Sequence, residues 1–155
     1  MTYAEAVDQF AVQAQALALG GVEAFQIESF SDVQEIQAAI EGVRQVSNLP
    51  IIASMSFDTK GKTLTGITPT VAAKELTRLG ANVVGANCGH GPWDMASIIR
   101  EMHAAVPSAL LLAKPNAGIP ELIDGTPTYT IEPARFALLG RDWVRAGARI
   151  VGGCC

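Results

Sequence analysis

The stretch LPIIASMSF (residues 49–57) is followed by TPTVAAKELTRLG (68–80) and then by ANVVGANC (81–88). The first and last are short runs that are apolar along most of their length, which is typical of buried strands. The middle one has apolar residues at helical spacing between Pro69 and Gly80, a residue pair that marks helix start and end. A strand, a helix and a strand in this order predict two parallel strands with a helix packed over them.

The same alternation extends from this unit toward both ends of the chain. Upstream, the sequence predicts a helix that begins at residue 3 and stops at Gly20-Gly21, a strand over 23–29 and a helix over 31–46. Downstream, it predicts a helix over 92–106, a strand over 109–117, a helix over 130–147 and a strand over 148–155. One helix, four βα units and a closing strand make an α/β protein with five parallel strands. Such a set suits a doubly wound sheet and part of an eight-stranded barrel equally well.

Composition narrows the class of protein. The 155 residues fit one domain, and 49% hydrophobic against 17% charged residues is typical of a folded globular chain. The net charge is −4, and the basic residues are scattered singly, which argues against nucleic acid as a partner. The sequence has neither an eighteen-residue apolar stretch nor a signal-peptide pattern at its start, so we expect no membrane span. Three cysteines, an odd number, favour a reducing compartment, and we expect a cytoplasmic protein.

Polar residues mark the C-terminal ends of the predicted strands. They are Glu28, Ser56, Asn87, Cys88, Lys114, Asn116, Cys154 and Cys155. In both candidate architectures these strand ends share one rim, where ligands bind. All three cysteines of the chain therefore converge at one rim in this prediction, although they are far apart in sequence.

Three thiolates at one rim suit a soft or borderline cation, above all zinc. Three protein ligands leave one position open, as in catalytic zinc sites. Gly152 and Gly153 precede the terminal pair and allow the backbone to bend, so that both Cys154 and Cys155 reach one ion. The alternative interpretation, that Cys88 is a small buried apolar residue and the terminal pair is incidental, stays open on these residues alone.

Five motifs carry a resemblance to a known family. They are FQIESFSDVQE (25–35), PIIASMSFDTKGKTLTG (50–66), GANCGHGP (85–92), KPNAGIPE (114–121) and GARIVGGCC (147–155). In order and spacing they resemble the homocysteine S-methyltransferase family, whose members are zinc-dependent thiol methyltransferases. The resemblance covers nearly the whole chain.

The resemblance implies a fold, a reaction and roles for particular residues. The implied fold is a (β/α)8 barrel, and the implied zinc ligands are Cys88, Cys154 and Cys155. Zinc would activate the thiol of homocysteine, which takes a methyl group from a donor to give methionine. The resemblance implies that Glu28 binds the amino group of the substrate. Asn116 is interpreted either as a substrate contact or as a residue of a backbone turn.

Other residues near the rim are assigned no direct role. His90 follows Cys88 closely, but its position in the family is not that of a zinc ligand. Met55, Met95 and Met102 are expected to fill the core.

The chain also departs from the family. A complete barrel needs about 200 residues or more, and the resemblance places the five strands as the fourth to the eighth. Residues 1–155 are therefore interpreted as a fragment, a partial homocysteine-binding barrel domain. We expect the strands to be parallel in chain order, with helices on the convex side and Ile27, Ile52 and Val84 on the concave face.

The donor and the partners are less defined by the motifs. Methylcobalamin or methyltetrahydrofolate, S-methylmethionine and betaine are all methyl donors within the family. The residues of the motifs GANCGHGP and KPNAGIPE favour the cobalamin-dependent enzymes. The missing part of the barrel and a corrinoid-binding domain are the expected protein partners. The alternative hypothesis is a non-catalytic zinc-binding or subunit-interaction fragment that needs a partner for the missing strands.

Overall fold

The structure, a computed structural model, describes residues 1–58 and 60–155; residue 59, within the 50–66 motif, lies outside the described residues. The elements in chain order are α1 (Tyr3–Leu19), β1 (Phe25–Phe30), α2 (Val33–Val46), β2 (Ile51–Ser56), α3 (Pro69–Arg78), β3 (Val83–Cys88), α4 (Met95–Ala105), β4 (Leu110–Pro115), β5 (Glu121–Ile123), β6 (Thr126–Thr128), α5 (Pro133–Ala146) and β7 (Ala148–Val151).

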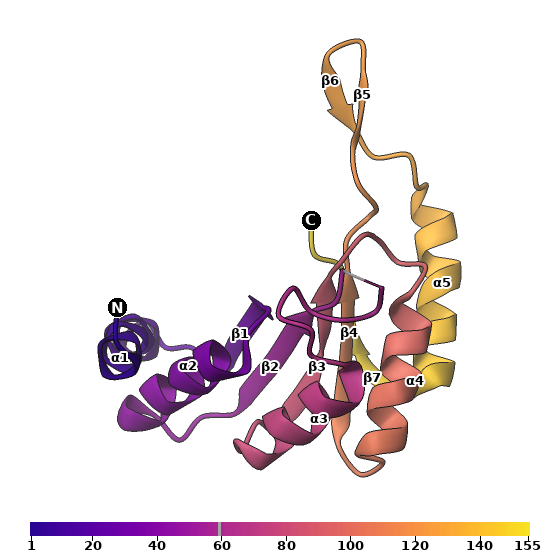
Figure 1. The fold of residues 1–155 in the computed structure, drawn as a ribbon. Helices are drawn as coiled ribbons and strands as arrows, with labels where there is room; N and C mark the ends of the chain where they lie inside the picture. The colour runs from indigo at the N-terminus through magenta and orange to yellow at the C-terminus, as the bar shows by residue number, and fades with distance from the viewer. Residues whose placement is uncertain (59) are drawn as a thin grey trace.

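The main sheet has five strands in the order β1-β2-β3-β4-β7, and every neighbouring pair is parallel (Figure 1). This confirms the predicted order and the alternation of strands with helices. The sheet is open, with β1 and β7 as its edges, so the fold is an incomplete barrel rather than a closed one.

Helices α2 to α5 cover one face of the main sheet, and the hydrophobic core lies between the two layers. A row of paired residues crosses the core side of the sheet: Ile27, Ala53, Val84, Leu111 and Ala148. The expectation that Ile27 and Val84 line the concave face is therefore wrong, because both pack into the core under the helices. Ile52, which alternates with Ala53, does lie on the opposite face. Val84 belongs to a strand that is buried along nearly its whole length, so no alternation marks its facing side. In β1, by contrast, polar residues alternate with Phe25 and Ile27, and that signal was available.

Local signals explain where the helices begin. Thr2 and Glu5 form a reciprocal capping box at the start of α1, and Asp32 accepts hydrogen bonds from two backbone amides at the start of α2. Thr68 caps α3, in which Pro69 occupies the first turn. These caps agree with the helix starts that the sequence predicts.

Strands β5 and β6 form an antiparallel hairpin that the sequence analysis did not predict. Their two-residue turn is Asp124-Gly125, with φ of 51° and 77°. Positive φ at both central residues is the geometry of tight hairpins, and Asp-Gly is a preferred pair there. The hairpin stands well beyond the C-terminal ends of the main strands (Figure 1). Because it is separate from the main sheet, it leaves the parallel order intact.

Candidate functional site

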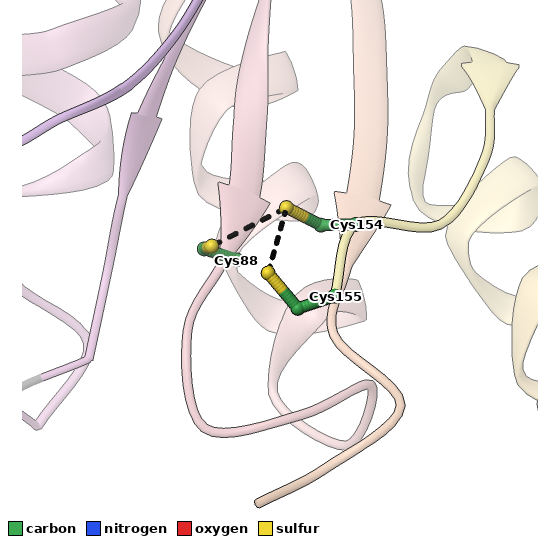
Figure 2. Close-up of side chains that lie close together, drawn as sticks. All are labelled: Cys88, Cys154 and Cys155. Carbon is green, nitrogen blue, oxygen red and sulfur yellow. Dashed lines mark hydrogen bonds between the residues drawn. The ribbon is translucent and has the colours of Figure 1, made fainter.

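The three cysteines meet at the C-terminal end of the main sheet. Cys88 is the last residue of β3, and the other two follow β7 (Figure 2). The Cys88 and Cys154 sulfurs lie 3.3 Å apart, and those of Cys154 and Cys155 lie 3.9 Å apart. All three sulfurs are within 4.8 Å of one another. The structure therefore brings together three thiols from two distant parts of the chain.

Backbone hydrogen bonds guide the segment after β7 to this position. Gly152 N–H donates to Ala113 O at 3.0 Å, and Cys154 N–H donates to Pro115 O at 2.9 Å. The segment thus continues along the end of β4, which brings its thiols toward β3. Cys88 itself has a φ of 59°, in the left-handed region that is uncommon for residues with a side chain. Residues held in this conformation cluster at active sites and ligand-binding sites.

Asn116 connects the two cysteine segments through its side-chain amide. Its Nδ2 donates to Gly89 O at 2.8 Å, and its Oδ1 accepts from Cys155 N–H at 3.1 Å. Both ends of the amide therefore hold backbone beside a cysteine. A contact of Asn116 with substrate stays a prediction.

Asn87 is the buried centre of a hydrogen-bond network beneath the thiols. Its side chain, only 1% exposed, accepts from Ser54 Oγ–H at 2.7 Å and from Ser29 N–H at 2.9 Å. Its Nδ2 donates to Ser29 Oγ at 2.7 Å and points to Cys154 Sγ at 3.8 Å. This one amide links β1, β2 and the segment that carries the terminal cysteines.

The surroundings shift the pKa values of Cys88 and Cys154 in opposite directions. Burial, reinforced by the neighbouring Cys154, raises the pKa of Cys88 to about 11. Burial also acts to raise the pKa of Cys154, but hydrogen bonds with Cys88, Asn87 and Cys155 outweigh it, so its pKa is lowered. Within this pair, Cys154 is the thiol that loses its proton more readily.

Glu28 lies on the same rim, next to an irregularity in β1. Three steps along β1, from Ile27 to Phe30, match two steps along β2, and Ser29 there has a φ of 70°. The Glu28 carboxylate accepts a hydrogen bond from Gln26 Nε2 and forms an ion pair with Lys114 Nζ at 2.7 Å. The hydrogen bond to Glu28 is the main reason why the pKa of Lys114 is raised.

The other residues near the rim lie in two different environments, and two further residues join the site. His90 is exposed and lies outside the cysteine cluster, whereas Met55, Met95 and Met102 are buried in the core. Asn87 and Lys114 are the residues whose contacts the sequence analysis missed. Their position at strand C-terminal ends was the available signal, but it gave them no specific role.

The spacing of the sulfurs fits a zinc ion. Three Zn–S bonds of about 2.3 Å at tetrahedral angles require sulfurs about 3.8 Å apart. Two of the three separations, 3.3 Å and 3.9 Å, lie on either side of that value, and the third is no longer than 4.8 Å.

In the part of the chain that the structure describes, no helix is both long and apolar enough to cross a membrane.

Comparison with the sequences of known proteins provides evidence that does not depend on the geometry of the site. The family profile described as "Homocysteine S-methyltransferase" matches residues 1–155. The chain is 30% identical over 161 residues to methionine synthase of Mycobacterium tuberculosis, covering 99% of this chain and 13% of that protein. It is 30% identical over 163 residues to S-methylmethionine–homocysteine S-methyltransferase BHMT2 of Rattus norvegicus, covering 94% of this chain and 44% of that protein. The chain thus spans less than half the length of either relative.

Solved structures match the fold. The apo form of the homocysteine methyltransferase MmuM from Escherichia coli superposes with a TM-score of 0.74 at 19% identity, over 96% of this chain and 52% of that chain. Its metallated form gives a TM-score of 0.73 at 19% identity, over 96% and 47%. The five strands and their helices therefore follow the arrangement found in about half of such a protein.

Proposed function

The chain belongs to the homocysteine S-methyltransferase family, and from this membership we propose that residues 1–155 form part of the homocysteine-binding barrel of a zinc-dependent methyltransferase. The reaction is methyl transfer to the thiol of homocysteine, which gives methionine. The convergence of Cys88, Cys154 and Cys155 within 4.8 Å is the observation that carries the proposal. The name of the metallated structural relative is in line with it, although that name describes only the other protein.

The three cysteines would hold the zinc ion as thiolates. When bound, zinc lowers the pKa of a coordinated substrate thiol, so that the thiolate is available near neutral pH. The amide of Asn87, which donates to Cys154, and the amide of Asn116, which fixes the Cys155 backbone, hold the ligand residues in position. Positioning by fixed hydrogen bonds is what such a site requires of its protein.

Glu28 would bind the ammonium group of homocysteine. Both of its hydrogen bonds among the described residues end on Oε2, so Oε1 is available to accept from an ammonium group. In the transfer, the substrate sulfur forms a bond to the methyl carbon. The bond from that carbon to the donor breaks, its electron pair leaves with the donor, and the thiol proton is released to solvent.

We assign methylcobalamin, recharged from methyltetrahydrofolate, as the methyl donor, and a corrinoid-binding domain as the partner that delivers it. Methionine synthases of two mycobacteria are among the relatives, which supports this choice. The relative named for S-methylmethionine represents the competing donor. Three free thiols suit a reducing compartment, and we therefore assign the protein to the cytoplasm.

The open sheet edges favour a second candidate, a non-catalytic zinc-binding or subunit-interaction fragment. Among the residues that the structure describes, β1 and β7 each have one neighbour in the sheet, and unpaired edges can accept strands from another chain. This candidate shares the zinc site with the first but requires no homocysteine.

One experiment separates the two candidates. The purified chain is loaded with zinc, its metal content is measured, and homocysteine is titrated by calorimetry. The enzyme proposal predicts about one zinc per chain and saturable homocysteine binding that disappears when the metal is removed with a chelator. Zinc retention without homocysteine binding would support the interaction fragment instead. Methionine formation with methylcobalamin, compared with S-methylmethionine and betaine, then tests the donor.

A further inference from the structure

An ion pair of opposite charges lies on the rim that carries the thiols. Glu28 comes from β1 and Lys114 from β4, and their charged atoms are 2.7 Å apart. Neither side chain is fully buried, with 33% of Glu28 and 24% of Lys114 exposed. A solute can therefore reach both charges.

Lys114 is closely associated with the cysteines. It pairs with Asn87 in the sheet register, so both side chains lie on the face opposite the helices. Its stem passes Gly152, where an added Cβ would lie 3.5 Å from Lys114 Cγ. The pKa of Lys114 is raised first by Glu28 and further by the charges of Cys154 and Cys88. The ion pair thus lies on the rim that carries the proposed metal ligands, and Pro115, which follows Lys114, pairs with Cys88 in the sheet register.

Both members of the ion pair can take a further partner. A lysine ammonium has three donors, and one of them serves Glu28. Among the described residues, no hydrogen bond ends on Glu28 Oε1. The two open positions have opposite preferences, one for an anion and one for a cation, and they lie side by side.

We propose, resting on the function proposed above, that Lys114 is a specificity-determining residue that binds the α-carboxylate of the amino-acid thiol while Glu28 binds its α-ammonium group. An α-amino acid carries these two charges on one carbon, so a receptor for it needs an adjacent anion and cation. The ion pair supplies both beside the thiols. Stabilisation of the fold alone explains the pair poorly, because partly exposed ion pairs contribute little.

The test uses three thiols that differ only in their charged groups. Homocysteine has both charges, 3-aminopropane-1-thiol lacks the carboxylate, and 4-mercaptobutanoate lacks the ammonium group. Each is titrated by calorimetry into the zinc-loaded full chain and into the variants Lys114→Met, Lys114→Arg and Glu28→Gln. Lys74→Met, which removes an exposed lysine on α3, is the control. Zinc content is measured for every variant.

Lys114→Met is expected to weaken binding of homocysteine and 4-mercaptobutanoate by roughly 10- to 100-fold, the range of a lost hydrogen bond to a charged group. Binding of 3-aminopropane-1-thiol is expected to stay within about twofold, because it has no carboxylate to lose. Glu28→Gln should weaken binding of homocysteine and 3-aminopropane-1-thiol, which carry the ammonium group, and leave binding of 4-mercaptobutanoate nearly unchanged. Lys114→Arg should retain most of the homocysteine affinity, because arginine also pairs with carboxylates.

Equal weakening of all three thiols by Lys114→Met would overturn the inference and make Lys114 a structural residue. The same conclusion follows if Lys114→Arg fails to restore homocysteine binding while its zinc content is normal. If the zinc-loaded unmodified chain binds none of the three thiols, the proposed function itself is wrong. Failure of the inference and failure of the function thus give different results.

Discussion

Glu28 and Lys114 are in direct contact although two strands, β2 and β3, separate their own strands in the sheet. Neighbouring strands are about 4.8 Å apart, so three spacings span about 14 Å on a flat sheet. Two long side chains cover that span by extending toward each other over β2 and β3, on the face opposite the helices. The ion pair thus connects β1, at the edge of the sheet, with β4 across the C-terminal ends of the strands between them.

Removal of one thiol is expected to abolish tight zinc binding. In Cys88→Ala the ion loses one of three sulfur ligands and the negative charge that offsets its own. Zinc content after dialysis, measured by atomic absorption, should fall from about one per chain to near zero. His90→Ala is the matched control and should retain the metal, because His90 is exposed and outside the cluster. The reverse result would make His90 the ligand.

The metal-free chain should react with alkylating agents in a characteristic pH-dependent way. The pKa of Cys88 is raised to about 11 by burial and by Cys154, so its thiol stays protonated well above pH 9. Its alkylation rate with iodoacetamide, followed by peptide mass spectrometry, should keep rising up to about pH 11. In urea the rate for the same peptide should level off near pH 9.

The same shift has a consequence for stability. A thiol whose pKa is raised in the folded state contributes stability below the unfolded pKa and loses it as pH rises through the folded value. Metal-free protein should therefore lose stability between about pH 9 and pH 11 through Cys88. A Cys88→Ala variant that shows the same loss over this interval would contradict the assignment.

Removal of the Asn87 side chain is expected to lower the free energy of unfolding by more than its size alone would suggest. Asn87→Ala leaves the buried Ser54 hydroxyl and the Ser29 N–H without their acceptor. An unsatisfied buried polar group costs about 1–3 kcal/mol, so urea unfolding should show destabilisation in at least that range. Asn48→Ala removes an exposed asparagine and should change the unfolding free energy by less than about 0.5 kcal/mol. Equal effects of the two substitutions would contradict the role of the network.

Gly42 marks a close crossing of α1 and α2. A Cβ there would lie 2.7 Å from Val7 O and 2.8 Å from Ala11 N, and these backbone atoms cannot rotate away. Gly42→Ala should therefore destabilise the chain by about 1–3 kcal/mol through overpacking, partly offset by the better helix propensity of alanine.

Gly140 in α5 provides the comparison. A Cβ at this position would meet only the Trp143 ring, at 3.7 Å, which is ordinary van der Waals contact. Gly140→Ala should leave stability unchanged or raise it by up to about 1 kcal/mol. Thermal unfolding of both variants measures the difference in stability. If Gly42→Ala leaves stability unchanged while Gly140→Ala lowers it, α1 and α2 do not pack as described.

The sequence predicted the elements well where local chemistry determines them. Caps such as Asp32 and Thr68, and the apolar runs of β2 and β3, determine structure through residues close to one another in the chain. It failed where a segment has few apolar residues, as in the β5–β6 hairpin, whose one strong signal is Asp124-Gly125. The facing side of Ile27 was misread although β1 does alternate, with Gln26 and Glu28 on the side opposite the buried Phe25 and Ile27.

The convergence of the cysteines followed from topology alone, because parallel strands end at one rim. The hydrogen-bond network around Asn87 could not be predicted in this way. It depends on the irregularity of β1 at Ser29, which no pattern of residues in the sequence indicates. The pairing of Glu28 with Lys114 was equally hidden, since it joins two strands that are not neighbours in the sheet. Positions were thus readable from the sequence, whereas side-chain partners across non-neighbouring strands were not.

The two sulfurs of Cys88 and Cys154 belong to residues 66 positions apart in sequence. An ion held by both acts as a reversible cross-link that closes a long loop containing β4, α5 and β7. Closing a loop of that length removes conformational entropy from the unfolded chain, as a disulfide does. The metal would therefore determine how firmly this half of the sheet is held, in addition to its role toward the substrate. Chelation should then loosen β7 and the end of β4 first, with faster amide hydrogen exchange there than in β1 and β2.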